Sequence, residues 1–238
     1  MKPKNIFAFF FILMLLMQIQ SCNKVQYHIF QSYINTYKKP EDIDFNVKKS
    51  GIIEFRSGLI KKNYSWISEG NDKIVYDSLC HAHNDISYNK KRDYIAYPHW
   101  GEASTLCING INIISNTDFD QNHPAGASLN NIVRLVSYSP KKFIDSGYID
   151  TFDWKYDSPG SFEGLYDFVN IEEMKNFHPI DKQLSELYVD DMKMLPPYVF
   201  GYLVFDSNPA DSKEHELTIT ISLCDGSNIE KTLVKVFD

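Results

Sequence analysis

Alternation of hydrophobic and polar residues near the C-terminus gives the clearest structural signal in this chain. From Leu217 to Leu223 every second residue is aliphatic and the residues between are polar or small. That period of two is expected for a strand with one buried face. Residues 225–228 are Asp-Gly-Ser-Asn, a typical turn, and residues 231–237 return as a second strand. The pattern predicts a terminal β-hairpin.

Four other segments have strand-like patterns, at residues 51–55, 73–76, 105–114 and 198–205. In the third of them the apolar phase shifts at Gly110, which predicts a bulge or tight bend. The fourth is apolar on both faces and is therefore expected to be a central strand.

Helical periodicity is confined to the middle of the chain. Leu129, Ile132, Val133 and Val136 follow the i, i+3, i+4, i+7 spacing, which predicts an amphipathic helix ending before Pro140. Residues 170–177 and 181–189 are further short helix candidates. These patterns predict a mainly β fold with one or two short helices, a β-sandwich-like single domain over residues 51–238.

Composition narrows the class of protein. The 238 residues are 43% hydrophobic and 14% aromatic, which excludes a largely disordered chain. The formal net charge of −7 gives no general basic footprint, so nucleic acid is not expected as a partner.

The N-terminus is typical of an export signal. Lys2 and Lys4 precede an apolar stretch at residues 6–17, and a polar segment follows. Twelve apolar residues form about 18 Å of helix, which is too short to span a hydrocarbon core of ~30 Å. We therefore expect residues 1–21 to be a signal peptide.

The end of this segment, Ile19-Gln20-Ser21-Cys22, resembles the lipobox of bacterial lipoproteins, although Gln20 departs from the usual small residue. The resemblance implies cleavage after Ser21, a diacylglyceryl group on the Cys22 thiol and acylation of the new amino terminus. The alternative is an ordinary secretory signal with a chance cysteine; both interpretations export the protein. Residues 22–50 are expected to be the lipidated N-terminus and tether.

The residues after Cys22 bear on location. Positions 23–26 contain neither an Asp directly after the cysteine nor an acidic run. Comparison with Bacteroides-type lipoproteins then implies an outer-membrane lipoprotein on the periplasmic rather than the surface face. Residues 22–62 hold eight Lys or Arg against four acids, so this end either binds anionic head groups or is an ordinary solvated face.

The layout of residues 70–238 is similar to a group of uncharacterised Bacteroides-type envelope lipoproteins. The motifs concerned are an Asp118-Phe119-Asp120 turn, the segment 124–130, a strand after Pro196-Pro197, and a final strand-turn-strand containing Asp225-Gly226. The resemblance implies no activity.

The segment Cys80-His81-Ala82-His83 is the main candidate for metal chemistry. On a strand, His81 and His83 would face the same side about 6.5 Å apart, with Asp85 or His99 as further ligands. Two such histidines are also ordinary polar residues of an exposed sheet face. The segment 118–122 begins like a calcium loop, but His123 occupies the position that needs glycine, so a turn is expected there.

Three tryptophans are candidates for stacking on sugar rings, namely Trp66, Trp100 and Trp154. Tryptophan is equally common in the core of a sandwich. Cys80, Cys107 and Cys224 allow at most one disulfide if Cys22 is acylated, and we expect buried free thiols.

The sequence thus predicts a lipid-anchored cell-envelope protein with a binding or structural role. The alternatives are a surface glycan-binding lipoprotein and a metal-dependent hydrolase centred on His81 and His83. We expect no catalytic residues and no cofactor. The expected partners are the membrane, reached through the anchor, and envelope proteins or glycans.

Overall fold

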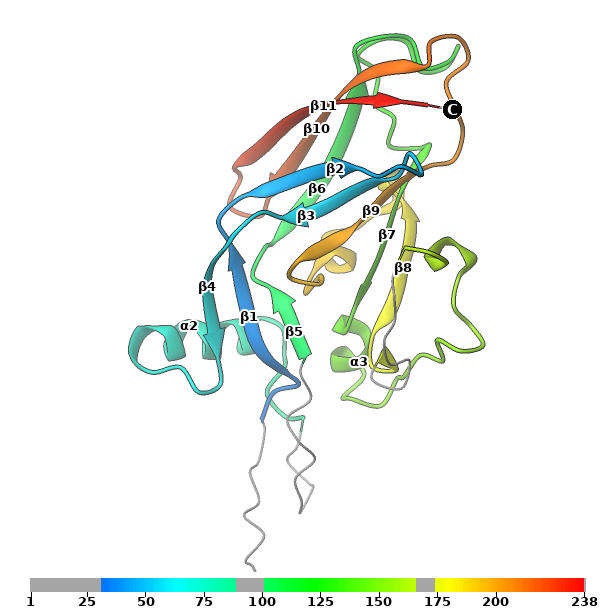
Figure 1. Ribbon diagram of the computed structural model, residues 1–238. Coiled ribbons are helices and arrows are strands. Elements are labelled where there is room, and N and C mark those ends of the chain that lie inside the picture. The colour runs from blue at the N-terminus through cyan, green and yellow to red at the C-terminus, as the bar shows by residue number, and fades with distance from the viewer. Residues whose placement is uncertain (1–30, 89–100, 166–173, 238) are drawn as a thin grey trace, which may run out of the picture.

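The computed structural model describes residues 31–88, 101–165 and 174–237 (Figure 1). Its strands are β1 (Ile34–Pro40), β2 (Ile43–Val47), β3 (Ile53–Ser57), β4 (Ile60–Ser65), β5 (Gly101–Ser104), β6 (Ile108–Ser115), β7 (Val133–Ser139), β8 (His178–Gln183), β9 (Val199–Phe205), β10 (Glu214–Leu223) and β11 (Asn228–Val236). The helices are α2 (Gly70–Ala82) and α3 (Lys141–Asp145), with three short 3₁₀ turns, η1 (Gly160–Phe162), η2 (Leu184–Glu186) and η3 (Val189–Met192).

Two sheets pack face to face and enclose the main core. One has the order β2-β3-β9-β7-β8 and the other the order β11-β10-β6. Aliphatic and aromatic side chains of both sheets form one buried cluster, which includes Phe55, Ile113, Leu135, Leu203 and Ile219. The expectation of a mainly β, sandwich-like single domain is confirmed.

Strand β9 lies in the middle of the five-stranded sheet, as its apolar pattern predicts. At Gly201 the neighbouring strand β7 comes very close: a Cβ atom there would lie 2.8 Å from the Leu135 Cδ1 atom and 2.9 Å from the Val136 carbonyl oxygen. Glycine is therefore required for the two central strands to pair at this distance.

A third sheet, β4-β1-β5, is built on strands that continue into the sandwich (Figure 1). Strand β1 runs on into β2, and β3 runs on into β4, so residues 34–65 form one long antiparallel ribbon. Backbone bonds from Glu41 N–H to Leu59 O and from Gly58 N–H to Asp42 O carry the pairing across the bend. The expected tether at residues 22–50 is wrong for this part, because residues 34–47 are strands with buried side chains.

Two sequence predictions exchange helix and strand. Residues 73–76, expected as a strand, lie inside α2, where Tyr76 and Cys80 form the buried face. The helix predicted from Leu129 to Val136 is instead a turn followed by β7, which is buried on both faces between β9 and β8. Residues 181–189 contribute to β8 and to 3₁₀ turns, and the first half of the helix candidate at 170–177 lies outside the described residues.

The terminal hairpin is confirmed. Leu217, Ile219 and Ile221 are fully buried, while Leu223 is only partly buried. Strand β10 pairs with β11 on one side and with β6 on the other, and the register slips next to Gly110, where the sequence predicted a bulge.

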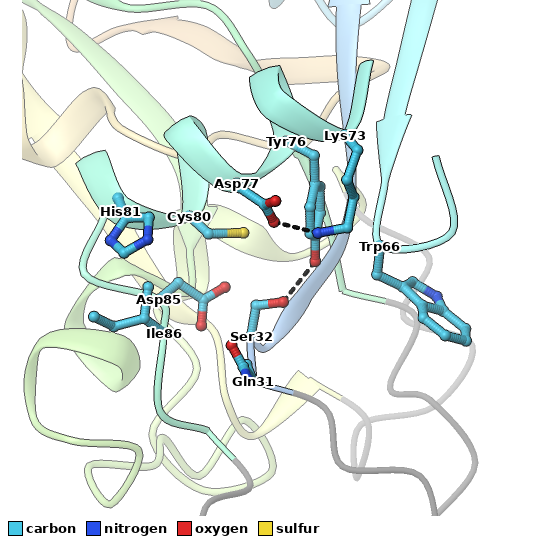
Figure 2. A pocket seen from close by; sticks show the side chains of 10 residues that line it. All are labelled: Gln31, Ser32, Trp66, Lys73, Tyr76, Asp77, Cys80, His81, Asp85 and Ile86. Atoms are coloured by element: carbon cyan, nitrogen blue, oxygen red, sulfur yellow. Dashed lines mark hydrogen bonds and ion pairs between the residues drawn. The ribbon is translucent and has the colours of Figure 1, made fainter. Parts of the chain in front are cut away.

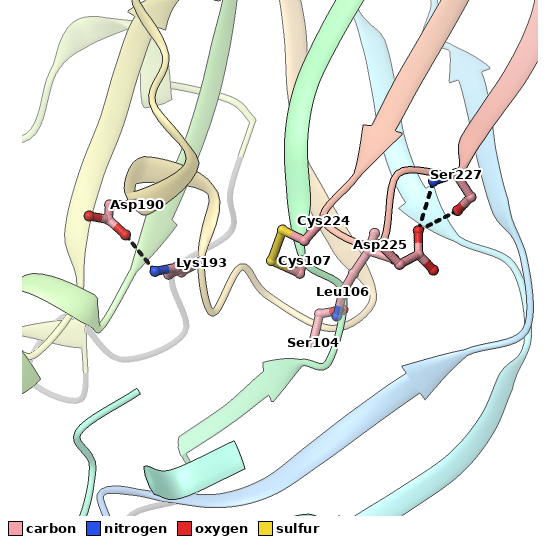
Figure 3. The surroundings of a disulfide bond; sticks show 8 residues. All are labelled: Ser104, Leu106, Cys107, Asp190, Lys193, Cys224, Asp225 and Ser227. Atoms are coloured by element: carbon pink, nitrogen blue, oxygen red, sulfur yellow. Dashed lines mark hydrogen bonds and ion pairs between the residues drawn. A yellow bond between two sulfur atoms is a disulfide. The ribbon is translucent and has the colours of Figure 1, made fainter. Parts of the chain in front are cut away.

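A disulfide joins Cys107 and Cys224, at the beginning of β6 and just beyond the end of β10 (Figure 3). The expectation of three free thiols is wrong for this pair. Cys80, the remaining cysteine of the described residues, is free and buried. The two cysteines are 117 residues apart but become neighbours because β6 and β10 pair antiparallel, and Cys224 N–H donates to Cys107 O at 3.0 Å.

Truncation of the buried hairpin face tests the register. We expect Ile221→Ala to lower the free energy of unfolding by about 2–5 kcal/mol, because it leaves a cavity between the two sheets. For a domain of this size that corresponds to a fall in melting temperature of roughly 5–15 °C. Thr220→Ala, on the opposite face, is the matched control and should cost less than about 1 kcal/mol. Equal effects of the two substitutions in thermal denaturation would contradict this register.

Candidate functional site

The C-terminal end of α2 places an acidic residue beneath the third sheet. Asn84 adopts the left-handed conformation, with φ 57°, directly after the helix. The Asn84 N–H donates to His81 O and the Asp85 N–H donates to Cys80 O, which is the bond pattern of a Schellman motif. This turn ends the helix and sends the chain back under β1.

Asp85 is fully buried and binds the beginning of β1. Its carboxylate accepts hydrogen bonds from the backbone N–H groups of Tyr33 and Ile34, at 2.7 and 2.8 Å. The Tyr148 hydroxyl donates a third, at 3.0 Å, from a residue that itself has a positive φ of 67°. One carboxylate therefore joins three segments that are far apart in the sequence.

A pocket of about 270 Å³ lies beside this carboxylate, between α2 and the first described residues of the chain (Figure 2). Its lining residues are Gln31, Ser32, Trp66, Lys73, Tyr76, Asp77, Cys80, His81, Asp85 and Ile86. We call it the α2 pocket. The Tyr76 hydroxyl donates to Ile34 O at 2.7 Å and bonds to the Ser32 hydroxyl, so the back wall is fixed by hydrogen bonds.

Three titratable groups of the pocket are affected by burial or by an ion pair. Burial, reinforced by the negative charge of Asp85, raises the pKa of the Cys80 thiol to about 11, so it is protonated at neutral pH. Burial also raises the pKa of Asp85 to about 6, against the opposing effect of its three hydrogen bonds. Lys73 forms an ion pair with Asp77. These properties suit binding, because a thiol nucleophile would need a lowered pKa.

The proposed pair of metal-binding histidines is wrong in its geometry. His81 and His83 lie at the end of a helix rather than on a strand; His81 is exposed, and His83 is partly buried and stacks on Tyr37. Burial, followed by the nearby Lys141 and Lys193, lowers the pKa of His83 to about 4. Within the described residues no three His, Cys, Asp or Glu side chains converge on a point; His99 lies outside them.

The three tryptophans do not form a common surface. Trp154 is only 3% exposed, and its indole N–H donates to the carbonyl oxygens of Met174 and Phe177. Trp66 is 39% exposed at the rim of the α2 pocket. Trp100 lies outside the described residues. The turn expected at residues 118–122, in place of a calcium loop, is confirmed: Asp120 accepts from the N–H groups of Asn122 and His123.

Sequence reasoning missed Asp85 as an organising residue and treated it only as a spare metal ligand. The available signal was Asn84, since asparagine can replace glycine in the left-handed position after a helix. That signal depends on recognising α2, and its exposed Ile74 and Val75 favour a strand assignment instead.

No family model matches the chain, and no curated protein or solved structure shows significant similarity to it. Among the helices of the described segments, none is long and apolar enough to cross a membrane.

The buried carboxylate predicts a pH dependence of stability. Because folding raises the pKa of Asp85 from 3.8 to about 6, the folded state holds this proton to a higher pH than the unfolded state. The resulting stabilisation, on the order of 3 kcal/mol, is present below pH 4 and is lost as the pH rises from about 4 to 6.

Asp85→Asn isolates this contribution from the other carboxylates. The variant side chain does not ionise. Its amide nitrogen, which is a donor, faces a backbone N–H that donates to the carboxylate in wild type. One hydrogen bond is therefore lost, and the variant should be less stable than wild type. We expect the difference in unfolding free energy between wild type and Asp85→Asn, measured by denaturant titration, to narrow between pH 4.5 and pH 7. A difference that is constant or widens would show that Asp85 is not the group responsible.

Proposed function

We propose that this protein is a lipid-anchored component of the bacterial cell envelope with a binding role, and that the α2 pocket is its binding site. The anchor is the diacylglyceryl group on Cys22, and the face is the periplasmic side of the outer membrane. The mature chain then begins at Cys22.

The disulfide between Cys107 and Cys224 is the observation that carries the assignment to the envelope. Disulfides persist in oxidising compartments such as the periplasm and are rare in the bacterial cytosol. The N-terminal segment with its lipobox-like end supplies an export signal and an attachment point that agree with this compartment. Two or three acyl chains hold a domain to a bilayer stably, whereas one chain does so only marginally.

The binding role is supported by the construction of the α2 pocket. Its walls are fixed by the Asp85 and Tyr76 hydrogen bonds, and its rim combines the Trp66 ring with the polar side chains of Gln31 and Lys73. A preformed site of this kind binds without first having to order its walls. The glycan-binding alternative loses its three-tryptophan face, since Trp154 belongs to the core, and the hydrolase alternative loses its paired histidines.

The anchor is tested by Cys22→Ala. We expect this variant to lose labelling by a radioactive or clickable fatty acid and to leave the detergent phase in Triton X-114 partitioning. Apolar residues 6–17 are too few to hold the chain across a bilayer. Gln18→Ala, which leaves all four lipobox residues in place, is a control for disturbance of the neighbouring sequence. Retention of the Cys22→Ala variant in the detergent phase would refute lipid anchoring.

Counting thiols tests the anchor and the disulfide in one experiment. The purified mature protein, denatured without reductant, should react with one equivalent of maleimide at Cys80, and with three equivalents after reduction. A free Cys22 would raise these values to two and four. Three equivalents before reduction would mean that the Cys107–Cys224 bond is absent and would remove the argument for an oxidising compartment.

A further inference from the structure

The loop between β4 and α2 exposes two large apolar side chains next to each other. Trp66 is 39% exposed and Ile67 is 68% exposed. The loop is a tight turn, in which Ser68 N–H donates to Ser65 O, and Ser68 Oγ accepts from Ser65 N–H. The backbone therefore holds both side chains at the surface. We call Trp66 and Ile67 the apolar tip.

The apolar tip lies where the chain enters the fold. Trp66 lines the same pocket as Gln31, the first described residue (Figure 2). Eight residues, 23–30, separate Gln31 from Cys22. A stretch of this length reaches at most roughly 30 Å when fully extended. A lipid on Cys22 would thus keep the apolar tip close to the bilayer surface.

The charges around the tip are largely neutralised by ion pairs. Lys62 pairs with Asp72 at 2.7 Å, and Lys73 pairs with Asp77. Because these two lysines are paired with acids, they attract anionic head groups only weakly, although residues 22–62 as a whole carry a net positive charge. Tryptophan has an apolar ring and a polar N–H, the combination that favours the head-group region of a bilayer.

We propose that the apolar tip inserts into the lipid head-group region and docks this end of the domain on the membrane that carries the anchor. The inference rests on the proposed lipidation of Cys22. The tether gives the tip a high effective concentration at the surface, so a contact too weak to hold a free domain suffices. Because the contact is apolar, it forms on neutral as well as anionic lipid and resists salt.

A fluorescent label on the tip measures this contact in the lipidated full-length mature protein. Ile67→Cys carries an environment-sensitive NBD label, and Gln121→Cys carries the same label in the exposed turn that follows β6, at the other end of the molecule (Figure 1). Native cysteines do not compete, because Cys80 is buried, Cys107 and Cys224 are bonded, and Cys22 is acylated. The proteins are reconstituted in vesicles of phosphatidylcholine, alone or mixed with anionic phosphatidylglycerol, each with and without brominated lipid.

We expect the label at position 67 to emit at shorter wavelength and to be quenched by brominated lipid at least threefold more than the label at position 121, at both 0.05 and 0.5 M salt. Trp66→Ser, with the native cysteines only, should lose most of the bromolipid quenching of intrinsic tryptophan fluorescence. Co-sedimentation of every sample with the vesicles checks the anchor separately.

Each other outcome overturns the proposal in a distinguishable way. Water-like emission at position 67 in a protein that co-sediments leaves the anchor intact and excludes docking. Quenching that appears only with anionic lipid and vanishes in high salt assigns the contact to lysines instead. A blue shift of the label in a Cys22→Ala background without vesicles indicates that a second copy of the protein covers the tip. Failure to co-sediment removes the anchor and the docking together.

Discussion

The ribbon of residues 34–65 has to belong to two sheets at once, and the rest of the structure is arranged around that constraint. Its β2–β3 half forms the edge of the five-stranded sheet of the sandwich, and its β1–β4 half forms most of the third sheet. A two-stranded ribbon alone is only marginally stable, so each half needs a partner of its own. Strand β9 pairs with β3, and the short parallel strand β5 pairs with β1.

Without α2 and α3, the β1–β4 half of the ribbon would still be exposed on one face. Tyr37 and Ile34 of β1 are buried against Tyr76 and Cys80 of α2 and against Phe143 of α3. Asp85 completes this second core by accepting hydrogen bonds from the backbone N–H groups of Tyr33 and Ile34, at the point where the ribbon begins. The carboxylate accepts hydrogen bonds at the end of β1 as the backbone of a neighbouring strand would. Its burial is tolerated because hydrogen-bond donors surround it.

The local pattern of hydrophobic and polar residues correctly predicted the strands in which either one face or both faces are buried along the whole strand. The alternation of β10 is strict because one face meets the core, and β9 is apolar throughout because both faces are covered. Strand β7 is also buried on both faces, but it was predicted as a helix. Leu129 and Ile132, in the turn before it, are apolar and happen to lie at helical spacing from the apolar residues of the strand. The strand predicted at residues 73–76 was wrong for the opposite reason: Ile74 and Val75 are β-branched yet exposed. The buried face of the helix is formed by Tyr76 and Cys80, which pack in the second core with residues distant in the sequence. The Cys107–Cys224 bond depends on the pairing of β6 with β10, which no spacing rule over 117 residues could reveal.

The position of the α2 pocket connects the fold to the proposed function. Gln31 and Ser32 directly precede the ribbon and form part of the pocket wall. Asp85 then fixes that wall to α2, and α2 carries Lys73, Asp77 and Tyr76 on the pocket side while the β4–α2 loop carries the apolar tip. If the tip rests on the bilayer, the pocket opens within the layer of solvent next to the head groups. Molecules that reach it are then those that occur at the membrane surface, and force on the tether acts directly on residues that form the site.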